Sequence, residues 1–217
     1  QRGAFTSVMA LQLRTIVNSP VTSNCHILYD DYSKHCLIID PGSENPEEIL
    51  GVIAELYLCP DYIFLTHEHF DHMWSCAALV EKYSIPIACS RICSFDIQDR
   101  KKNLSVFYNQ VGIVSPPARV ILEEVDWILD WKGKQVCFYN SPGHSVGGVI
   151  FIIGKYLFTG DTLMKDIATS TKFCCSSKER LKETLAFIET LKGQHLLVCP
   201  GHGDTFELDD YDLRKAL

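Results

Sequence analysis

The sequence predicts an α/β protein whose β-sheets are covered by helices. Short apolar runs of strand length recur along the chain, and segments with helical spacing and capping residues lie between them. The chain has 217 residues, 47% of them hydrophobic, which is enough to build one large core. We expect a single domain, because α/β architectures often reach this length undivided.

The expected strands are short apolar runs of the length and composition typical of β-structure. They are Cys25–Tyr29, Cys36–Asp40, Tyr62–Leu65, Ile85–Cys89, Val136–Tyr139, Val149–Ile153, Tyr156–Phe158 and Leu196–Cys199. The first helix is predicted between the second and third of these runs. It has Asn45 as its cap, Pro46 at its first position and Glu48 in place to close a capping box. Its apolar face consists of Ile49, Val52, Ile53 and Leu56.

A second helix is expected late in the chain. It begins at Ser176, has Glu179 three residues later, and can end at Gly193. Its buried face consists of Leu181, Leu185 and Ile188. A third helix is expected after His72, through Cys76, Ala77 and Val80. Residues 91–118 show no clear period, and we interpret them as a mobile cover.

Composition and charge exclude several classes of protein. The net charge of −7 argues against a nucleic-acid partner, because such proteins usually carry a basic stripe. The basic cluster Arg100–Lys102 is interpreted as a solvated face. No apolar run approaches the roughly 20 residues that cross a bilayer, so no membrane partner is expected. Residues 1–8 have no signal-peptide pattern and are interpreted as an expression remnant or a disordered arm, with Met9 as the native start.

The ten cysteines are interpreted as small core residues and not as a disulfide framework. Cys36, Cys137 and Cys199 lie inside apolar runs, whereas the roles of the neighbouring pair Cys174 and Cys175 stay open between core or loop filler and pocket lining. No C-x-x-C pair occurs, so neither a redox dithiol nor a zinc ribbon is indicated. We therefore expect a reducing, cytoplasmic location.

Residues of the types that commonly bind metals follow four of the apolar runs. The four segments are IFLTHEHFDH, VCFYNSPGH, YLFTGD and LLVCPGH. They supply His67, His69, Asp71, His72, His144, Asp161 and His202. Ligand sites collect at the ends of strands, where the backbone is rigid and the side chains are free. We therefore expect these seven residues to form one site.

The spacing of these residues favours two metal ions. His67 and His69 are two residues apart, so in an extended chain they point to the same side and can share one metal. Asp71 and His72 lie where the chain turns into a helix, so they can hold a second ion. The remaining two histidines could complete one metal each, and the two oxygens of Asp161 could bridge both. Imidazoles with carboxylate support suit zinc, with iron or manganese as alternatives.

Other histidines and one serine motif are interpreted differently. His26, His35 and His195 stand alone and are expected to be structural or exposed. The segment GHSVG matches the serine-hydrolase pattern G-x-S-x-G around Ser145. That pattern requires a helix after the serine, but GGVIFII follows and reads as a strand, so we reject this interpretation. The zincin pattern H-E-x-x-H fails, because Asp71 stands where its second histidine belongs.

At this point the chain resembles the metallo-β-lactamase superfamily, and within it the glyoxalase II-like branch, over nearly all of residues 9–217. The matching motifs are H-E-H-F-D-H at 67–72, P-G-H-S at 142–145, F-T-G-D-T at 158–162 and P-G-H-G at 200–203. The resemblance implies an αββα four-layer sandwich with a dinuclear metal site at one edge. It assigns one metal to His67, His69 and His144, the other to Asp71, His72 and His202, and the bridge to Asp161.

Two departures from glyoxalase II put a glutathione thioester in doubt as the substrate. The sequence stops fifteen residues after His202, where glyoxalase II adds a helical domain that binds glutathione. The family's G-R-[ST] segment aligns with Thr169, Ser170 and Thr171. The chain is more similar to compact single-domain members of the branch. True β-lactamases of the superfamily usually lack a bridge of the Asp161 type, so antibiotic hydrolysis is not expected.

The resemblance implies a dinuclear hydrolase, most simply with two zinc ions, that attacks a thioester, lactone or other small ester with a metal-bridging hydroxide. Asp71 is both a ligand and the candidate catalytic residue that orients the hydroxide. The first alternative is a mononuclear iron enzyme similar to persulfide dioxygenases, and the second is a metal-binding module without catalysis. We expect a small-molecule substrate and a monomer or homodimer.

Overall fold

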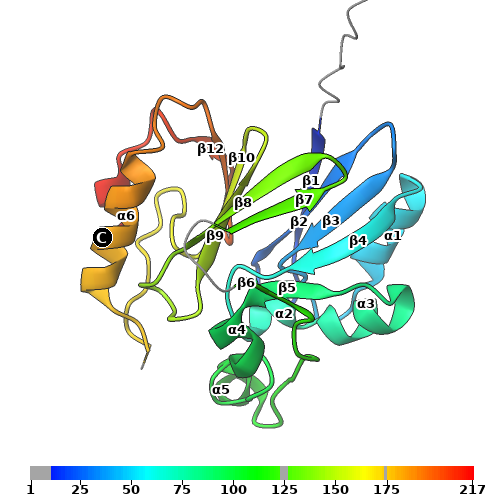
Figure 1. Ribbon diagram of the computed structural model, residues 1–217. Helices are drawn as coiled ribbons and strands as arrows, with labels where there is room; N and C mark the ends of the chain where they lie inside the picture. The colour runs from blue at the N-terminus through cyan, green and yellow to red at the C-terminus, as the bar shows by residue number, and fades with distance from the viewer. Residues whose placement is uncertain (1–10, 123–126, 174) are drawn as a thin grey trace, which may run out of the picture.

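The computed structural model describes residues 11–122, 127–173 and 175–217, and it confirms the expected sandwich of two mixed sheets covered by helices. The two six-stranded sheets pack against each other, with α1 and α3 outside the first and α6 outside the second (Figure 1). The interpretations of residues 1–8 and of Cys174 lie outside the described residues.

The first sheet has the strand order β1-β2-β3-β4-β5-β6. These strands are β1 (Leu11–Val17), β2 (Asn24–Asp30), β3 (His35–Ile39), β4 (Cys59–Phe64), β5 (Ile87–Ser90) and β6 (Val120–Leu122). The first three pair antiparallel, and β3 to β6 pair parallel. Parallel neighbours need long crossovers, which here contain helices. These are α1 (Glu47–Glu55), α2 (Phe70–Met73), α3 (Cys76–Tyr83), α4 (Arg91–Asp96) and α5 (Ser105–Asn109).

The second sheet has the order β12-β11-β10-β9-β8-β7. Its strands are β7 (Trp127–Trp131), β8 (Lys134–Asn140), β9 (Val149–Ile153), β10 (Tyr156–Gly160), β11 (Leu197–Pro200) and β12 (Phe206–Glu207). Only β10 and β11 pair parallel in this sheet, and α6 (Lys178–Glu189) lies in the connection between them. A short 3₁₀-helix (Leu213–Ala216) follows the last strand.

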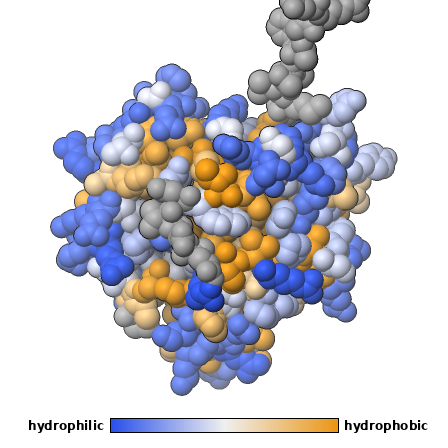
Figure 2. Space-filling model, in the orientation of Figure 1, coloured by the Kyte–Doolittle hydropathy of each residue, from blue (hydrophilic) through white to orange (hydrophobic). Residues whose placement is uncertain are grey.

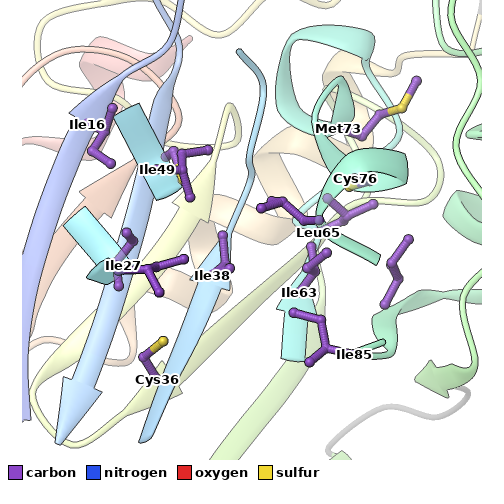
Figure 3. Close-up of a cluster of buried hydrophobic side chains, with 14 of the residues drawn as sticks. Ile16, Ile27, Cys36, Ile38, Ile49, Ile63, Leu65, Met73, Cys76 and Ile85 are labelled. Atoms are coloured by element: carbon purple, nitrogen blue, oxygen red, sulfur yellow. The ribbon is translucent and has the colours of Figure 1, made fainter. Parts of the chain in front are cut away.

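Three hydrophobic clusters hold these layers together. Between the sheets, the ring of Phe64 contacts those of Phe138 and Phe151 at centroid distances of 5.3 and 5.4 Å. Between the first sheet and its helices, Ile49 of α1 and Met73 of α2 pack with strand residues such as Ile38 (Figure 3). A third cluster lies between the second sheet and α6. Burial of this kind is the main favourable term in folding.

Every predicted strand is present, and the four strands that were not predicted are the edges of the two sheets. They are β1, β6, β7 and β12. Edge strands carry mixed apolar and polar residues, as the alternating exposure along β1 illustrates. On the face shown in Figure 2 most residues are hydrophilic, and hydrophobic residues gather near the centre, where the open edges of both sheets lie in Figure 1.

The helix starts and ends differ from the predictions. Pro46 is the residue before α1, and the Asn45 side chain accepts a hydrogen bond from the Glu47 amide, so the predicted capping box with Glu48 is wrong. For α6, the cap is Ser177 and not Ser176, because the Ser176 hydroxyl donates to the Phe173 carbonyl instead.

The remaining helix predictions hold in part. The buried face of α6 is confirmed, but the helix ends at Glu189, and Gly193 closes a turn beyond it with φ of +88°. The third predicted helix is confirmed as α3, and a separate short helix that was not predicted, α2, precedes it. Residues 91–118 contain α4 and α5, which the lack of period concealed.

The described cysteines are free thiols, and most are buried. Cys36 and Cys199 are core residues as predicted, whereas Cys137 is half-buried and Cys175 is exposed. Burial raises the pKa of the Cys36 and Cys199 thiols above the ordinary range, which keeps them protonated and unreactive. In the described part of the chain, no helix is both long and apolar enough to cross a bilayer.

A candidate dinuclear metal centre at one edge of the sandwich

The seven predicted site residues come together at one end of the two sheets. Thr66 and His67 follow the end of β4, and His144 follows the end of β8. Asp161 is the first residue after β10, and His202 lies two residues after β11. Both sheets therefore contribute side chains to one site, as expected for ligands that follow strand ends.

The first cluster consists of His67, His69 and His144, all of them buried. The Nδ1 atom of His69 lies 3.1 Å from Nε2 of His67 and 3.0 Å from Nε2 of His144. Nitrogen ligands of a tetrahedral zinc ion lie about 3.3 Å apart, given Zn–N bonds of about 2.0–2.1 Å. The three nitrogens therefore converge as the ligands of one ion do.

Hydrogen bonds on the far side of two rings leave the converging nitrogens unprotonated. The Nδ1 atom of His144 donates to the Ser170 carbonyl at 3.0 Å. The Thr66 hydroxyl donates to the Asp40 carboxylate, so it accepts from Nδ1 of His67 at 3.0 Å. With Nδ1 as the donor of each ring, Nε2 points into the cluster, which is the arrangement that binds a metal.

The second cluster consists of Asp71, His72 and His202. Oδ2 of Asp71 lies 3.4 Å from Nε2 of His202 and 3.6 Å from Nε2 of His72. Each ring again uses its Nδ1 elsewhere: that of His202 donates to the Thr22 carbonyl, and that of His72 donates to Asp40. A carboxylate oxygen and two ring nitrogens therefore face one another without a shared hydrogen bond of ordinary length.

Asp161 lies between the two clusters. Its Oδ1 is 3.4 Å from Nε2 of His72, and its Oδ2 is 3.5 Å from Nε2 of both His144 and His202. Among the described residues, the buried atoms Oδ1 of Asp161 and Nε2 of His72 have no hydrogen-bond partner. Buried polar atoms are nearly always satisfied, so these two atoms suit a bound cation as their partner. The residues present therefore fit a pair of metal ions.

The pKa shifts favour neutral rings in the first cluster and an ionised Asp161 between the two clusters. Burial lowers the pKa of His67, and it lowers that of His69 to about 3, so both rings are neutral at pH 7. Burial alone would raise the pKa of Asp161, but the nearby His72 and His144 hold it well below its ordinary value. Burial would lower the pKa of His72, but Asp71 and Asp161 raise it. A positive charge is thus favoured between His72 and the two carboxylates.

Asp40 is a functional residue that the sequence analysis missed. It follows β3 with φ of +51°, a left-handed backbone that is uncommon outside glycine. Its carboxylate accepts hydrogen bonds from the Thr66 amide at 2.8 Å, the Thr66 hydroxyl at 2.6 Å and Nδ1 of His72 at 3.1 Å. It orients His72 directly and His67 through Thr66. The detectable signal was its position, because it too ends an apolar run.

Gly201 leaves room for the centre. A Cβ atom at this position would collide with Oδ1 of Asp161 and would lie 2.8 Å from Cε1 of His72. Any larger residue would push the carboxylate away from the ring. Gly201 is therefore required, because the backbone approaches the site closely at this position.

Ser145 does not form a serine-hydrolase site. Its hydroxyl is buried and donates to Oε2 of Glu68 at 3.1 Å, and strand β9 follows it where the motif requires a helix. Burial raises the pKa of Glu68 to about 7. The other predicted bystanders are also confirmed: His26 is a buried structural residue, His35 pairs with Asp61, and His195 is exposed.

A cavity of about 710 Å³ opens onto both clusters. We call the candidate metal ligands in its lining the floor and the other lining residues, which are mostly apolar, the wall. The floor residues are His69, Asp71, His144, Asp161 and His202, and the wall residues are Phe70, Leu104, Phe107, Tyr108, Ser170, Lys172 and Phe173. Part of the segment 91–118 thus borders the site, as its interpretation as a cover requires; its mobility stays a prediction.

Comparison with known proteins shows similarity to one family along most of the chain. Residues 18–206 match the family model of the metallo-β-lactamase superfamily. The chain is 28% identical to the probable metallo-hydrolase YqgX of Bacillus subtilis, over 95% of this chain and 98% of that protein. It is 31% identical to a hydroxyacylglutathione hydrolase of Serratia proteamaculans, over 68% of this chain but only 51% of that protein.

Two solved structures are similar along nearly their whole length. The B3 metallo-β-lactamase BLEG-1 has a TM-score of 0.84 and 25% identity, covering 91% of this chain and 94% of that one. The di-iron-bound form of TTHA1623 has a TM-score of 0.73 and 27% identity, covering 90% and 94%.

Proposed function

Because the chain belongs to the metallo-β-lactamase superfamily and is a metal-dependent hydrolase at that level, we propose that it hydrolyses a thioester, lactone or other small ester at a dinuclear centre. The observation that carries the proposal is the position of Asp161. Its Oδ2 lies 3.5 Å from a ring nitrogen of each cluster, in His144 and His202, and the buried Oδ1–His72 pair has no hydrogen-bond partner in the described chain.

The protein's own residues have distinct roles in this proposal. His67, His69 and His144 would hold one ion, Asp71, His72 and His202 would hold the other, and Asp161 lies close to ring nitrogens of both groups. When bound, such ions lower the pKa of water from 15.7 to about 7 and polarise the carbonyl group under attack.

Asp71 has a second role in the proposal, as the residue that orients the attacking group. Its carboxylate lines the cavity floor and is 13% exposed. Burial would raise its pKa, but the neighbouring His72 lowers it, so the side chain is an ionised acceptor at pH 7. Ser145 has no part in the chemistry, because it is buried against Glu68.

Zinc is the metal that this donor set suits best, because imidazoles and carboxylates without thiolate form its usual catalytic sites. Iron is the second candidate, and the di-iron form of the similar structure TTHA1623 supports it. The rival oxidoreductase, a mononuclear iron enzyme similar to persulfide dioxygenases, would need only part of the ligand set.

Metal analysis separates these proposals. Protein purified without chelator, from cells supplied with zinc, iron and manganese, should contain about two ions per chain. A single ion that stays single after metal is added back would contradict the dinuclear hydrolase and favour the oxidoreductase. Activity would then be measured on a short thioester, a lactone, a glutathione thioester and a β-lactam, the last because BLEG-1 carries the name of a β-lactamase.

We expect the glutathione thioester to be a poorer substrate than the short thioester. The tripeptide carries several charges, whereas the cavity wall outside the proposed ligands has one charged residue, Lys172. Remote contacts help drive the transition state, so their absence lowers kcat/KM. A kcat/KM for the glutathione thioester in the range of about 10⁴–10⁸ M⁻¹s⁻¹, well above the other substrates, would contradict this expectation.

A further inference from the structure

The residues of the cavity wall indicate which class of substrate the site accepts. The inference drawn from them rests on the proposed hydrolase function. We infer that α5, together with Phe70 and Phe173, forms a binding subsite for an apolar group of the substrate, such as an alkyl chain or an aryl ring beside the reacting carbonyl. This subsite makes apolar acyl compounds the preferred substrate class.

Phe70 and Tyr108 of the cavity wall belong to a cluster of aromatic rings that also contains Trp74. The ring of Tyr108 lies 5.0 Å from that of Phe70 and 5.7 Å from that of Trp74, and the last two are 5.8 Å apart. Aromatic groups at such distances stabilise one another. Phe107, next to Tyr108, is 77% exposed and lines the cavity without a ring contact of its own among the described residues. It is available to cover an apolar ligand.

The wall is fixed to the metal-binding segment. The Phe70 amide, between His69 and Asp71, donates to the carbonyl of Asn103 at 2.9 Å. The fully buried Asn103 side chain donates to the carbonyls of Ile97 and Ile113 and accepts from the Ser105 amide at the start of α5. Satisfied buried polar groups rigidify a segment. The position of α5 relative to the proposed metals is therefore defined.

Phe173 adds another apolar ring to the cavity lining. Phe173 presents its ring edge-on to His69 at 5.1 Å and to His144 at 5.5 Å. It is still 38% exposed. Isolated exposed aromatics need no explanation, but Phe107, Tyr108 and Phe173 all border the same cavity beside the proposed ligands. An apolar group of the substrate that moves from water into this cavity would cover these three rings.

The size of the effect follows from the cost of apolar surface in water. Each methylene fully removed from water improves affinity by about fourfold. In an open cavity we take half of that burial, so four added methylenes, from acetyl to hexanoyl, raise kcat/KM by about tenfold or more.

The test uses the metal-loaded protein and two series of thioesters. One series varies the acyl group from acetyl to octanoyl on one thiol, and the other varies the alkyl thiol on an acetyl group. In at least one series kcat/KM should rise by about tenfold per four methylenes. Phe107→Ser should reduce that rise severalfold. The matched control is Phe95→Ser, since Phe95 is 66% exposed on the neighbouring α4 but does not line the cavity; it should leave the rise intact.

A binding measurement separates failure of the subsite from failure of the proposed function. Alkyl hydroxamates of increasing length are titrated into the same protein by calorimetry, which needs no turnover. Octanohydroxamate should bind about tenfold or more tightly than acetohydroxamate, and Phe107→Ser should narrow that gap. Absence of hydrolysis with this gap present would contradict only the proposed function. Flat chain-length profiles in both assays, or equal effects of Phe95→Ser and Phe107→Ser, would overturn the subsite.

Discussion

Asp161 joins the two clusters of the site, since its carboxylate lies 3.5 Å from His144 of the first cluster and 3.4 and 3.5 Å from His72 and His202 of the second. We predict that Asp161→Ala removes both activity and much of the bound metal. The loss of activity should exceed the roughly 10- to 100-fold effect typical of a supporting residue. Steady-state kinetics and metal analysis on the same preparation would measure both effects.

The contrasting substitution is Ser145→Ala, in the segment that imitates a serine hydrolase. Because the Ser145 hydroxyl is buried against Glu68, its loss should leave hydrolysis within several-fold of the parent. If turnover disappears while the metal content is unchanged, the serine would be the true nucleophile and the metal mechanism would be wrong.

Asp40 is outside the two proposed ligand clusters, but it orients residues of both. Asp40→Ala removes the acceptor that orients His72 directly and His67 through Thr66. Supporting residues of this kind typically change metal affinity by about 10- to 100-fold, and we predict a loss of that size. Competition with a zinc-binding dye would measure it. An unchanged affinity would show that the two rings keep their orientation without the carboxylate.

Asp30 tests electrostatics away from the site. Burial would raise its pKa, but Lys134 at 2.6 Å and the amides of Tyr32 and Ser33 lower it to about 2. A depressed pKa stabilises the fold above the unfolded-state pKa of about 3.9 and loses that stabilisation as the pH falls toward 2. Asp30→Asn should therefore reduce the free energy of unfolding by about 1 kcal/mol at pH 7, a value discounted because Lys134 is partly solvated. Denaturant titrations at pH 7 and pH 3 should show the difference shrinking at the lower pH.

At the scale of elements, the start of α6 offers a matched pair of serines. Ser177 accepts a hydrogen bond from the Arg180 amide, whereas the Ser176 hydroxyl donates to the Phe173 carbonyl of the preceding turn. Ser177→Ala should lower the free energy of unfolding by about 1 kcal/mol, the usual cost of losing an N-cap. Ser176→Ala should cost clearly less in the same thermal or denaturant titration. The opposite ranking would restore Ser176 as the cap.

The elements that could be predicted from the sequence are those whose burial is uniform. Interior strands such as β3 and β9 are continuous apolar runs, and their identification needs no knowledge of neighbours. In the edge strands β1 and β7, exposed side chains are mixed with buried or half-buried ones. These strands are therefore identified only by their pairing with a neighbouring strand. Helix α5 is held by the side chains of Asn103 and Ser105, which leave no periodic pattern.

The candidate site was predictable for a related reason. Each of the seven proposed ligands follows an apolar run within a few residues, so the sequence indicates which strand end carries it. Asp40 follows such a run as well, but a lone carboxylate at a strand end is common, and only its contacts with Thr66 and His72 reveal its role. The apolar cavity wall could not be predicted, because it depends on how α5 packs against Phe70.

At the scale of the whole molecule, the proposed metals should stabilise the entire fold. The ligands come from both sheets, so bound ions favour the folded state over the unfolded one by mass action, about 4 kcal/mol at a thousand times Kd. Treatment with a chelator should lower the thermal midpoint, and added zinc should restore it. A midpoint insensitive to both would indicate that the ions do not bridge the sheets. The Asp161→Ala protein should respond less than the parent.

The strand orders of the two sheets show that residues up to Leu122 build one sheet and residues from Trp127 onward build the other. Four of the proposed ligands lie in the first half, and three lie in the second. On a ribosome, His67 therefore emerges 135 residues before His202, a delay on the order of 10 s at usual rates of synthesis. Until then a nascent chain offers incomplete clusters, so the complete set of proposed ligands exists only after His202 has been synthesised.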